Sequence, residues 1–233
     1  MSVMYQIGLV PAFLNGIYVS DYSFKKLATH GDYGLGTVNQ LNGEMIAVDG
    51  KFYCIDEHGV AQEIAETECT PFSVVSFFKP TIVQEIQNIN DLNQLNQTLL
   101  GMMDNINLFY MFRIDGEFSS VQLRSETCHC TQDKPLAKLL VECQKKYELP
   151  HTIGSIVATY SPSYANQMCI QAFHYHFINE QRSTGGHVFD LKVKQANISL
   201  QPIENFQLDL INLPRLAHTD LNLNIESELK KIE

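Results

Sequence analysis

Residues 173–187 read FHYHFINEQRSTGGH, and this stretch holds three of the chain's eight histidines. Side chains two apart on a β-strand point to the same face, so His174 and His176 are expected to project side by side. A loop over residues 179–186 would return the chain antiparallel and would bring His187 opposite the pair. The pattern therefore predicts a β-hairpin on which three imidazoles converge.

Three converging imidazoles favour a metal site, although three partly buried histidines of a sheet would give the same pattern. Structural zinc sites normally use four protein ligands and often thiolates, whereas three histidines leave one position open for water or substrate. A metal at His174, His176 and His187 is therefore expected to be catalytic. Imidazole suits zinc, copper, iron and nickel alike, so the ligands do not fix the metal.

The composition is that of an acidic globular protein. The chain has 233 residues, is 45% hydrophobic and carries a formal net charge of −10. No cluster of Lys and Arg offers the basic face that a nucleic-acid-binding protein needs, so that class is excluded. No apolar run reaches membrane-spanning length, and the first residues do not resemble a secretory signal. A cytoplasmic location without a membrane partner is expected.

Six cysteines are scattered along the chain, and only Cys128 and Cys130 are close together. A disulfide framework is not expected in a cytosolic chain of this size. The triplet Cys128-His129-Cys130 could hold a metal, but the second cluster that usually completes such a site is absent from the sequence.

The order of elements predicts an α+β fold of two mainly antiparallel or mixed β-sheet units with a few helices, and the metal site on strands of the second unit. Turn signals predict hairpins at the following dipeptides: Asn42-Gly43, Asp49-Gly50 and Asp115-Gly116. Capping signals predict a short helix over 23–31, apolar spacing predicts helices over 82–103 and 135–147, and the polar tail 220–233 is helix-prone. Strand-like runs follow the third helix at 152–160, 167–178, 187–197 and 206–213.

The helix over 135–147 is expected to separate the two sheet units. The predicted boundaries are an N-terminal unit over 1–147 and a C-terminal unit over 148–233, which could also behave as one compact domain.

Three segments together resemble the alpha-acetolactate decarboxylase family. Residues 173–188 are similar to its run H-x-H-F-I followed by G-G-H, and GDYGLGTVNQLNGEMIAVDGKFY (Gly31–Tyr53) is similar to a second run. RIDGEFSSVQLRS (Arg113–Ser125) resembles a third. The matches occur in family order and span most of the chain, so together they are more specific than any one of them.

The resemblance implies an enzyme that converts 2-acetolactate to acetoin and CO2, with zinc on the three histidines. It implies catalytic roles for Glu44, Arg124 and a tail glutamate, best matched by Glu233, with Glu226 and Glu228 as alternatives. Thr37 is expected to bind substrate. Family members commonly form homodimers, and a homodimer is expected here.

The expected chemistry follows from the reaction. Loss of CO2 leaves an enediolate, so a Lewis acid and a hydrogen-bond donor are needed where negative charge develops on oxygen. Glu44 is the candidate donor of the proton that the reacting carbon then takes up. Arg124 is the candidate donor of a hydrogen bond to a substrate oxygen.

Two other classes remain open from the residues alone. A cupin-like oxygenase would add Glu180 as a ligand, four residues after His176. A binding protein in which zinc only braces the sheet would need four protein ligands and would show no turnover.

Overall fold

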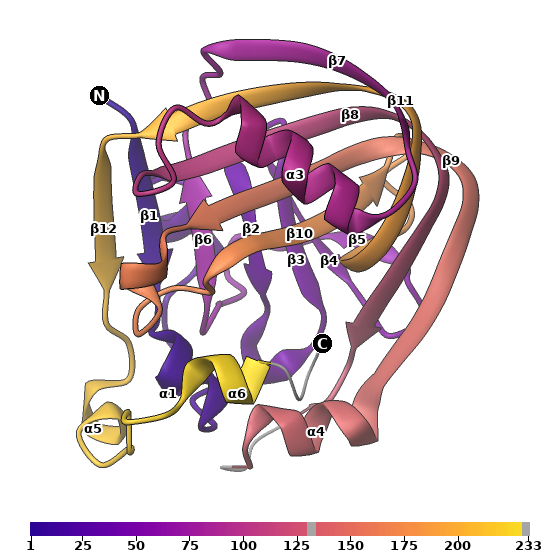
Figure 1. Cartoon of the computed structure of the whole chain (residues 1–233). Coiled ribbons are helices and arrows are strands. Elements are labelled where there is room, and N and C mark those ends of the chain that lie inside the picture. The colour runs from indigo at the N-terminus through magenta and orange to yellow at the C-terminus, as the bar shows by residue number, and fades with distance from the viewer. Residues whose placement is uncertain (130–133, 230–233) are drawn as a thin grey trace.

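The structure is a computed structural model, and it describes residues 1–129 and 134–229. Two β-sheets make up most of the fold, as the sequence predicts (Figure 1). The first sheet runs in the order β12-β1-β6-β2-β3-β4-β5, and its only parallel pairing among the described strands joins β1 to β12. Its strands are β1 Val3–Ile7, β2 Tyr33–Thr37, β3 Glu44–Val48, β4 Lys51–Ile55, β5 Ala61–Glu63, β6 Ser73–Ser76 and β12 Asn205–Asp209.

The second sheet contains long, bent, antiparallel strands in the order β10-β9-β8-β11-β7. Its strands are β7 Ile82–Ile89, β8 Phe109–Glu126, β9 Gln144–Ser161, β10 Ala172–Asn179 and β11 Gly185–Ile203. The start of β11 pairs with β10 as well as with β8, so the strands β8 to β11 close on one another. This closure brings β10 and β11 side by side where the histidines lie.

Short helices occupy the connections and the C-terminal segment. They are α1 Val10–Leu14, α2 Phe24–Leu27, α3 Leu92–Met102, α4 Leu136–Cys143, α5 Leu213–Leu216, α6 Ile225–Leu229 and the 3₁₀ turns Asn39–Leu41 and Ser163–Ala165. No helix in the described ranges is long and apolar enough to cross a membrane.

Strand alternation sorts the core into layers. Phe112 and Ile114 of β8 pack with Leu95 of α3 on the outer face of the second sheet. Met111, the residue before Phe112, packs on the opposite face with Ile46 of the first sheet. Successive side chains of a strand point to opposite faces, so one strand serves both layers. The space between the two sheets is therefore where groups from both can meet.

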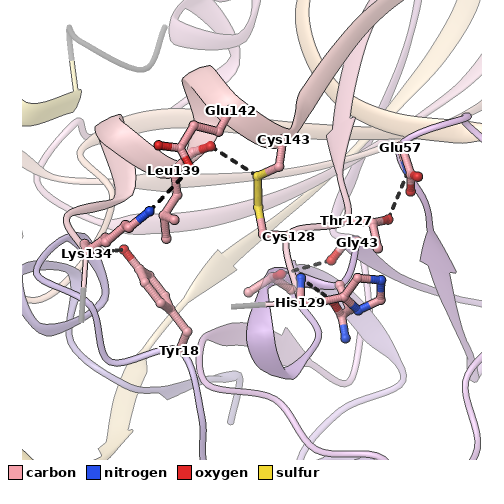
Figure 2. Close-up of a disulfide and its surroundings, with 12 residues drawn as sticks. Tyr18, Gly43, Glu57, Thr127, Cys128, His129, Lys134, Leu139, Glu142 and Cys143 are labelled. Carbon is pink, nitrogen blue, oxygen red and sulfur yellow. Dashed lines mark hydrogen bonds and ion pairs between the residues drawn. A yellow bond between two sulfur atoms is a disulfide. The ribbon is translucent and has the colours of Figure 1, made fainter. Parts of the chain in front are cut away.

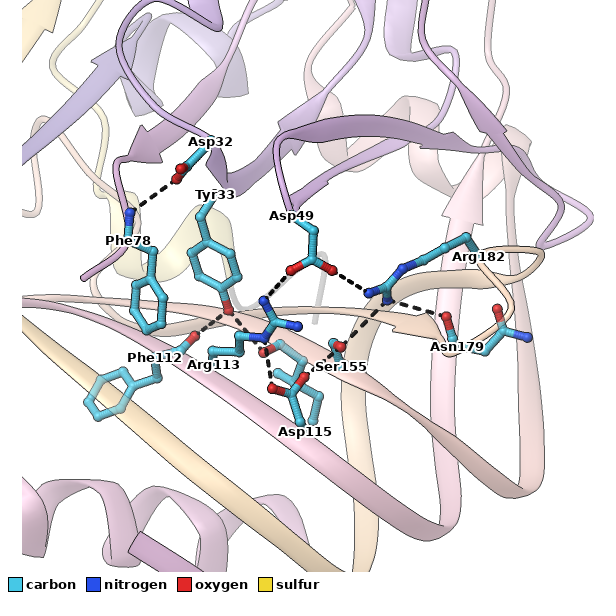
Figure 3. Close-up of polar contacts among 11 residues, drawn as sticks. Asp32, Tyr33, Asp49, Phe78, Phe112, Arg113, Asp115, Ser155, Asn179 and Arg182 are labelled. Atoms are coloured by element: carbon cyan, nitrogen blue, oxygen red, sulfur yellow. Dashed lines mark hydrogen bonds and ion pairs between the residues drawn. The ribbon is translucent and has the colours of Figure 1, made fainter. Parts of the chain in front are cut away.

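A polar network ties the two sheets together at the β3–β4 turn (Figure 3). Asp49 accepts hydrogen bonds from Nη1 of Arg113 at 2.5 Å and from Nη2 of Arg182 at 2.8 Å. Asp115 accepts from Nε of Arg113 at 2.7 Å and from Oγ of Ser155 at 2.6 Å. These charge-assisted contacts fix the first sheet against the second.

The predicted hairpin at Asp115-Gly116 is wrong, because β8 runs unbroken from Phe109 to Glu126. A Cβ on Gly116 would lie 2.2 Å from the carbonyl oxygen of Gln195, so this glycine permits close strand packing rather than a turn. The Asp49-Gly50 hairpin is confirmed, with φ of 54° and 76° at the two residues. Both values are positive, as a type I′ turn requires.

The predicted helix over 82–103 is correct only in its second half. Residues 82–89 form β7, which pairs with β11, and α3 begins after Asp91, whose side chain accepts a hydrogen bond from the Gln94 amide at 2.8 Å. The expected helix over 135–147 also ends early, because β9 starts at residue 144. In both segments pairing with a neighbouring strand overrides the helical spacing.

The boundary between two sheet units predicted at residue 147 remains a prediction. The second sheet nevertheless draws strands from both sides of that position, since β7 and β8 precede it and β9, β10 and β11 lie at or beyond it.

A disulfide joins Cys128 to Cys143 (Figure 2), so the expectation that the chain forms none is wrong. Glu126 and Gln144 are paired neighbours on β8 and β9, and this pairing brings the two flanking cysteines to a Cα–Cα separation of 5.3 Å. The bond removes Cys128 from the metal pair considered with Cys130. Cys130 itself lies outside the described residues.

Candidate metal centre and catalytic pocket

The three predicted histidines converge on one point. His174 and His176 lie on β10, and His176 is paired with His187 at the start of β11. One ring nitrogen of each histidine lies within 4.8 Å of the other two. Tyr175 points to the outer layer with Phe177, as strand alternation predicts. The hairpin geometry expected from the sequence is confirmed.

The chemistry of this group fits a divalent metal. Nε2 of His174 lies 3.2 Å from Nδ1 of His187. Tetrahedral ligands at about 2.0–2.1 Å from a metal would be about 3.3–3.4 Å apart, which is close to that separation. Nε2 of His176 is buried and makes no hydrogen bond among the described residues, although the Glu44 carboxyl lies 3.3 Å away. A buried polar atom without a hydrogen bond is costly, and a metal ion would satisfy it.

The second nitrogen of His176 is held by the backbone. Nδ1 lies 2.9 Å from the Met45 carbonyl oxygen of β3. Because a carbonyl only accepts, Nδ1 carries the proton and Nε2 presents its lone pair to the histidine group. Burial lowers the pKa of His176 to about 3, against the raising effect of the Met45 hydrogen bond. The ring is therefore neutral at physiological pH, as a metal ligand must be.

The other two histidines share this environment. Burial holds the pKa of His174 and of His187 well below the usual value, and the positive charge of Arg124 adds to the effect in both. All three ligand candidates are therefore neutral at physiological pH and need not lose a proton before they bind a metal.

Glu44 begins β3 and brings a carboxyl from the first sheet to the histidines of the second. Its Oε2 lies 3.3 Å from Nε2 of His176, and its Oε1 lies 3.9 Å from Nδ1 of His187. Burial raises the pKa of Glu44 well above its usual range, and the carboxyl of Glu126 raises it further, whereas Arg124 opposes the shift. A carboxyl in this setting can hold a proton beside the histidine group.

Arg124 lies on β8 at the position paired with His187. Its side chain is buried, and its Nη2 lies 3.2 Å from Nε2 of His187, whose other ring nitrogen, Nδ1, faces His174. Cross-strand pairs share one face of a sheet, so the strand register places the guanidinium beside His187, a candidate metal ligand.

The other predicted site residues are Thr37 and the tail glutamates, and those of them that the structure describes do not belong to the histidine group. Thr37 ends β2, is buried, and donates from Oγ1 to the Gly43 carbonyl at 2.8 Å. Glu226 is exposed on α6. Glu228 lies on the same short helix and does not line the cavity beside the histidines. Glu233 lies outside the described residues.

A cavity of about 410 Å³ opens onto this group. Its polar end is lined by Thr37, Glu44, Arg124, Glu126, His174 and His187. Its apolar walls come from three short helices, through Phe13 of α1, Leu140 of α4 and Leu229 of α6, among others. These helices lie together at one end of the sheets (Figure 1). An apolar pocket with a few convergent polar groups is the usual form of a small-molecule site.

Glu126 is an acidic residue of the pocket that the sequence prediction missed. It is 4% exposed, and burial raises its pKa to about 7 even though Arg124 and a hydrogen bond with Glu44 both lower it. Its position two residues after Arg124 on one strand was the available signal, because such residues share a face.

Known proteins that are similar to this chain belong to one family. Residues 4–223 match the family model for alpha-acetolactate decarboxylase. The chain is 34% identical to the alpha-acetolactate decarboxylase of Bacillus licheniformis over 94% of its length and 86% of the relative. It is 32% identical to that of Bacillus subtilis over 95% of its length and 87% of the relative.

Solved structures agree as well. The crystal structure of alpha-acetolactate decarboxylase from Bacillus subtilis strain 168 superposes with a TM-score of 0.94 at 29% identity, covering 98% of each chain. The family and the decarboxylase class expected from the sequence are thereby confirmed, and this chain belongs to the alpha-acetolactate decarboxylase family.

Proposed function

We propose that this enzyme converts 2-acetolactate to acetoin and CO2 in the cavity above the three histidines, with zinc as the metal. The observation that carries the proposal is the group of His174, His176 and His187, which opens on a cavity lined by Glu44 and Arg124. Membership of the decarboxylase family supplies the substrate.

The three histidines are the residues that would hold the metal. Neutral imidazoles leave its charge uncompensated, so a bound zinc ion would act as a Lewis acid toward substrate oxygens on which negative charge develops. Side chains of the protein would orient the substrate and transfer the proton.

Arg124 is proposed to donate a hydrogen bond to a substrate oxygen. Its guanidinium is held by a buried strand next to His187, so it is in place before substrate arrives. A contact that held only the departing carboxylate would stabilise the substrate and slow the reaction. The proposed contact therefore strengthens as charge builds on the enediolate oxygen.

Glu44 is proposed to protonate the carbon that loses CO2. Its carboxyl reaches within 3.3 Å of His176 and is buried from water. A buried, protonated carboxyl can deliver its proton to one face of the enediolate. Thr37 is proposed to contact the substrate at the same end of the cavity, where its hydroxyl keeps accepting capacity after donating to Gly43.

The roles expected for the tail glutamate, the homodimer and the cytoplasmic location remain proposals from the sequence. Truncation before Glu233, sedimentation and cell fractionation test them separately. The oxygenase alternative loses its fourth ligand candidate, because Glu180 is exposed in the turn after β10 and does not belong to the histidine group.

The test is reconstitution. Treatment with a chelator should abolish CO2 and acetoin formation from acetolactate, and added zinc should restore both in equal amounts. Oxygen consumption, measured in parallel, should be absent. Turnover that survives complete removal of metal would contradict the proposed zinc-dependent function.

A further inference from the structure

Glu126 is a pocket side chain that the proposed mechanism does not use. It is the last residue of β8 and stands two positions beyond Arg124. Side chains at this spacing share one strand face, so Glu126 projects toward the same cavity as the arginine. Its side chain is buried and forms part of the cavity wall.

Glu126 and Glu44 come from different sheets and line the same cavity, and a hydrogen bond between their carboxyls affects the pKa of both. The preceding residue of β8 fixes the backbone of the same partner. Ser125 accepts a hydrogen bond at Oγ from the Glu44 amide at 3.4 Å and donates to the Ile55 carbonyl at 2.6 Å. Adjacent residues of β8 therefore hold both the main chain and the side chain of Glu44.

Stability does not account for this arrangement. The two carboxyls lie in a cavity whose walls include Leu136 and Leu140. Burying a carboxyl in apolar surroundings is unfavourable, and an apolar side chain of similar size would fit such a wall at less cost. The contact between Glu126 and Glu44 is therefore better explained by an effect on the Glu44 carboxyl than by an effect on the stability of the fold.

We propose that Glu126 is a positioning residue that fixes the orientation of the Glu44 carboxyl beside the histidine group. The inference rests on the proposed function, because it assigns Glu126 a part in the turnover of acetolactate. Glu44 otherwise has rotational freedom around its side-chain bonds, and a restrained carboxyl meets the reacting carbon more often in the productive geometry.

The effect should fall on turnover. Glu126 touches the proton donor, so its loss should lower kcat and leave KM unchanged. Supporting partners of catalytic groups typically contribute about 10–100-fold in activity, and a fall in kcat of that size is expected for Glu126→Leu. Glu126→Gln should recover part of the loss, because an amide can still hydrogen-bond the Glu44 carboxyl.

The experiment compares Glu126→Leu and Glu126→Gln with wild type and with Glu117→Gln. Glu117 lies on the same strand but its side chain is half exposed, so it serves as the matched control. For each protein kcat, KM, bound zinc and the thermal midpoint are measured. The expected Glu126→Leu variant has low kcat, wild-type KM, full zinc content and a midpoint no lower than wild type.

Two results would overturn the inference. One is a Glu126→Leu variant with wild-type kcat. The other is a variant whose loss of kcat accompanies loss of zinc or of thermal stability, which would make the role structural. A wild-type protein that releases no CO2 from acetolactate would overturn the proposed function first, and this inference with it, so the two failures are distinguishable.

Discussion

Oε2 of Glu44 lies 3.3 Å from Nε2 of His176, and the two residues belong to different sheets. The same imidazole is anchored through Nδ1 to the carbonyl of Met45, the residue after Glu44. Strand β3 therefore contributes a carboxyl to the site and also orients one of the three histidines. Any displacement of β3 relative to β10 should affect both the metal ligands and the acid.

Replacement of Glu44 by Gln should lower kcat by about 10²–10⁴-fold, because the amide has the same shape but no acidic proton to transfer. Bound zinc should be retained, since Glu44 is not one of the three grouped ligands. Steady-state CO2 release and metal analysis check both parts. Glu63→Gln, on the exposed strand β5, is the control. Wild-type turnover in Glu44→Gln would remove Glu44 from the proposed role.

Arg124→Lys should lower kcat by about 100-fold or more, and lower it more than it raises KM. An ammonium keeps the charge but cannot reproduce the planar, forked donor held beside His187. Arg215→Lys, on α5 and away from the cavity lining, retains a charge and should leave kcat unchanged. If Arg124→Lys keeps full turnover, the proposed hydrogen bond from Arg124 to the substrate oxygen is contradicted.

The stability of the metal-free protein should depend on Glu126 in a pH-dependent way. Its folded pKa of about 7 lies above the unfolded value, so the native state binds more protons between those two values and loses stability as pH rises through them. Glu126→Gln should match wild type near pH 4 and be more stable at pH 8, by up to about 3 kcal/mol. Denaturant unfolding of the two apoproteins at both pH values measures this. An equal difference at both pH values would contradict it.

The Cys128–Cys143 disulfide should stabilise the protein by about 2–4 kcal/mol, since it closes a loop that contains α4. Cys143→Ser, or reduction of the wild type, should lower the free energy of unfolding by that amount. Cys69→Ser, which alters a free thiol, should change it little. Because Leu136 and Leu140 of α4 line the cavity, KM should also rise when the bond is lost. An unchanged unfolding curve after verified reduction would show that the bond carries no stability.

The part of the site that could be predicted from sequence is the part built from local geometry. His174, His176 and His187 belong to one hairpin, so strand alternation and a single antiparallel return suffice to place them together. Arg124 reaches the same point through the pairing of β8 with β11, and Glu44 reaches it through the packing of the first sheet against the second. Only the resemblance to a family brought them into the prediction.

The errors have a common physical origin in long-range strand pairing. Residues 82–89 space their apolar side chains as a helix does, but pairing with β11 decides their conformation. Asp115-Gly116 has the composition of a turn, but Gly116 is needed where β8 crosses close to Gln195. Cys128 and Cys143 meet because Glu126 pairs with Gln144, and no local pattern shows that register.

The most direct test of the three-histidine site is to measure bound zinc and CO2 release together on His176→Ala. The variant should fold, lose nearly all bound zinc and release no CO2 from acetolactate, because it removes one of the three grouped ligands. His58→Ala, at an exposed histidine, should keep both properties. A His176→Ala protein with normal zinc content and normal CO2 release would contradict the assignment of this site.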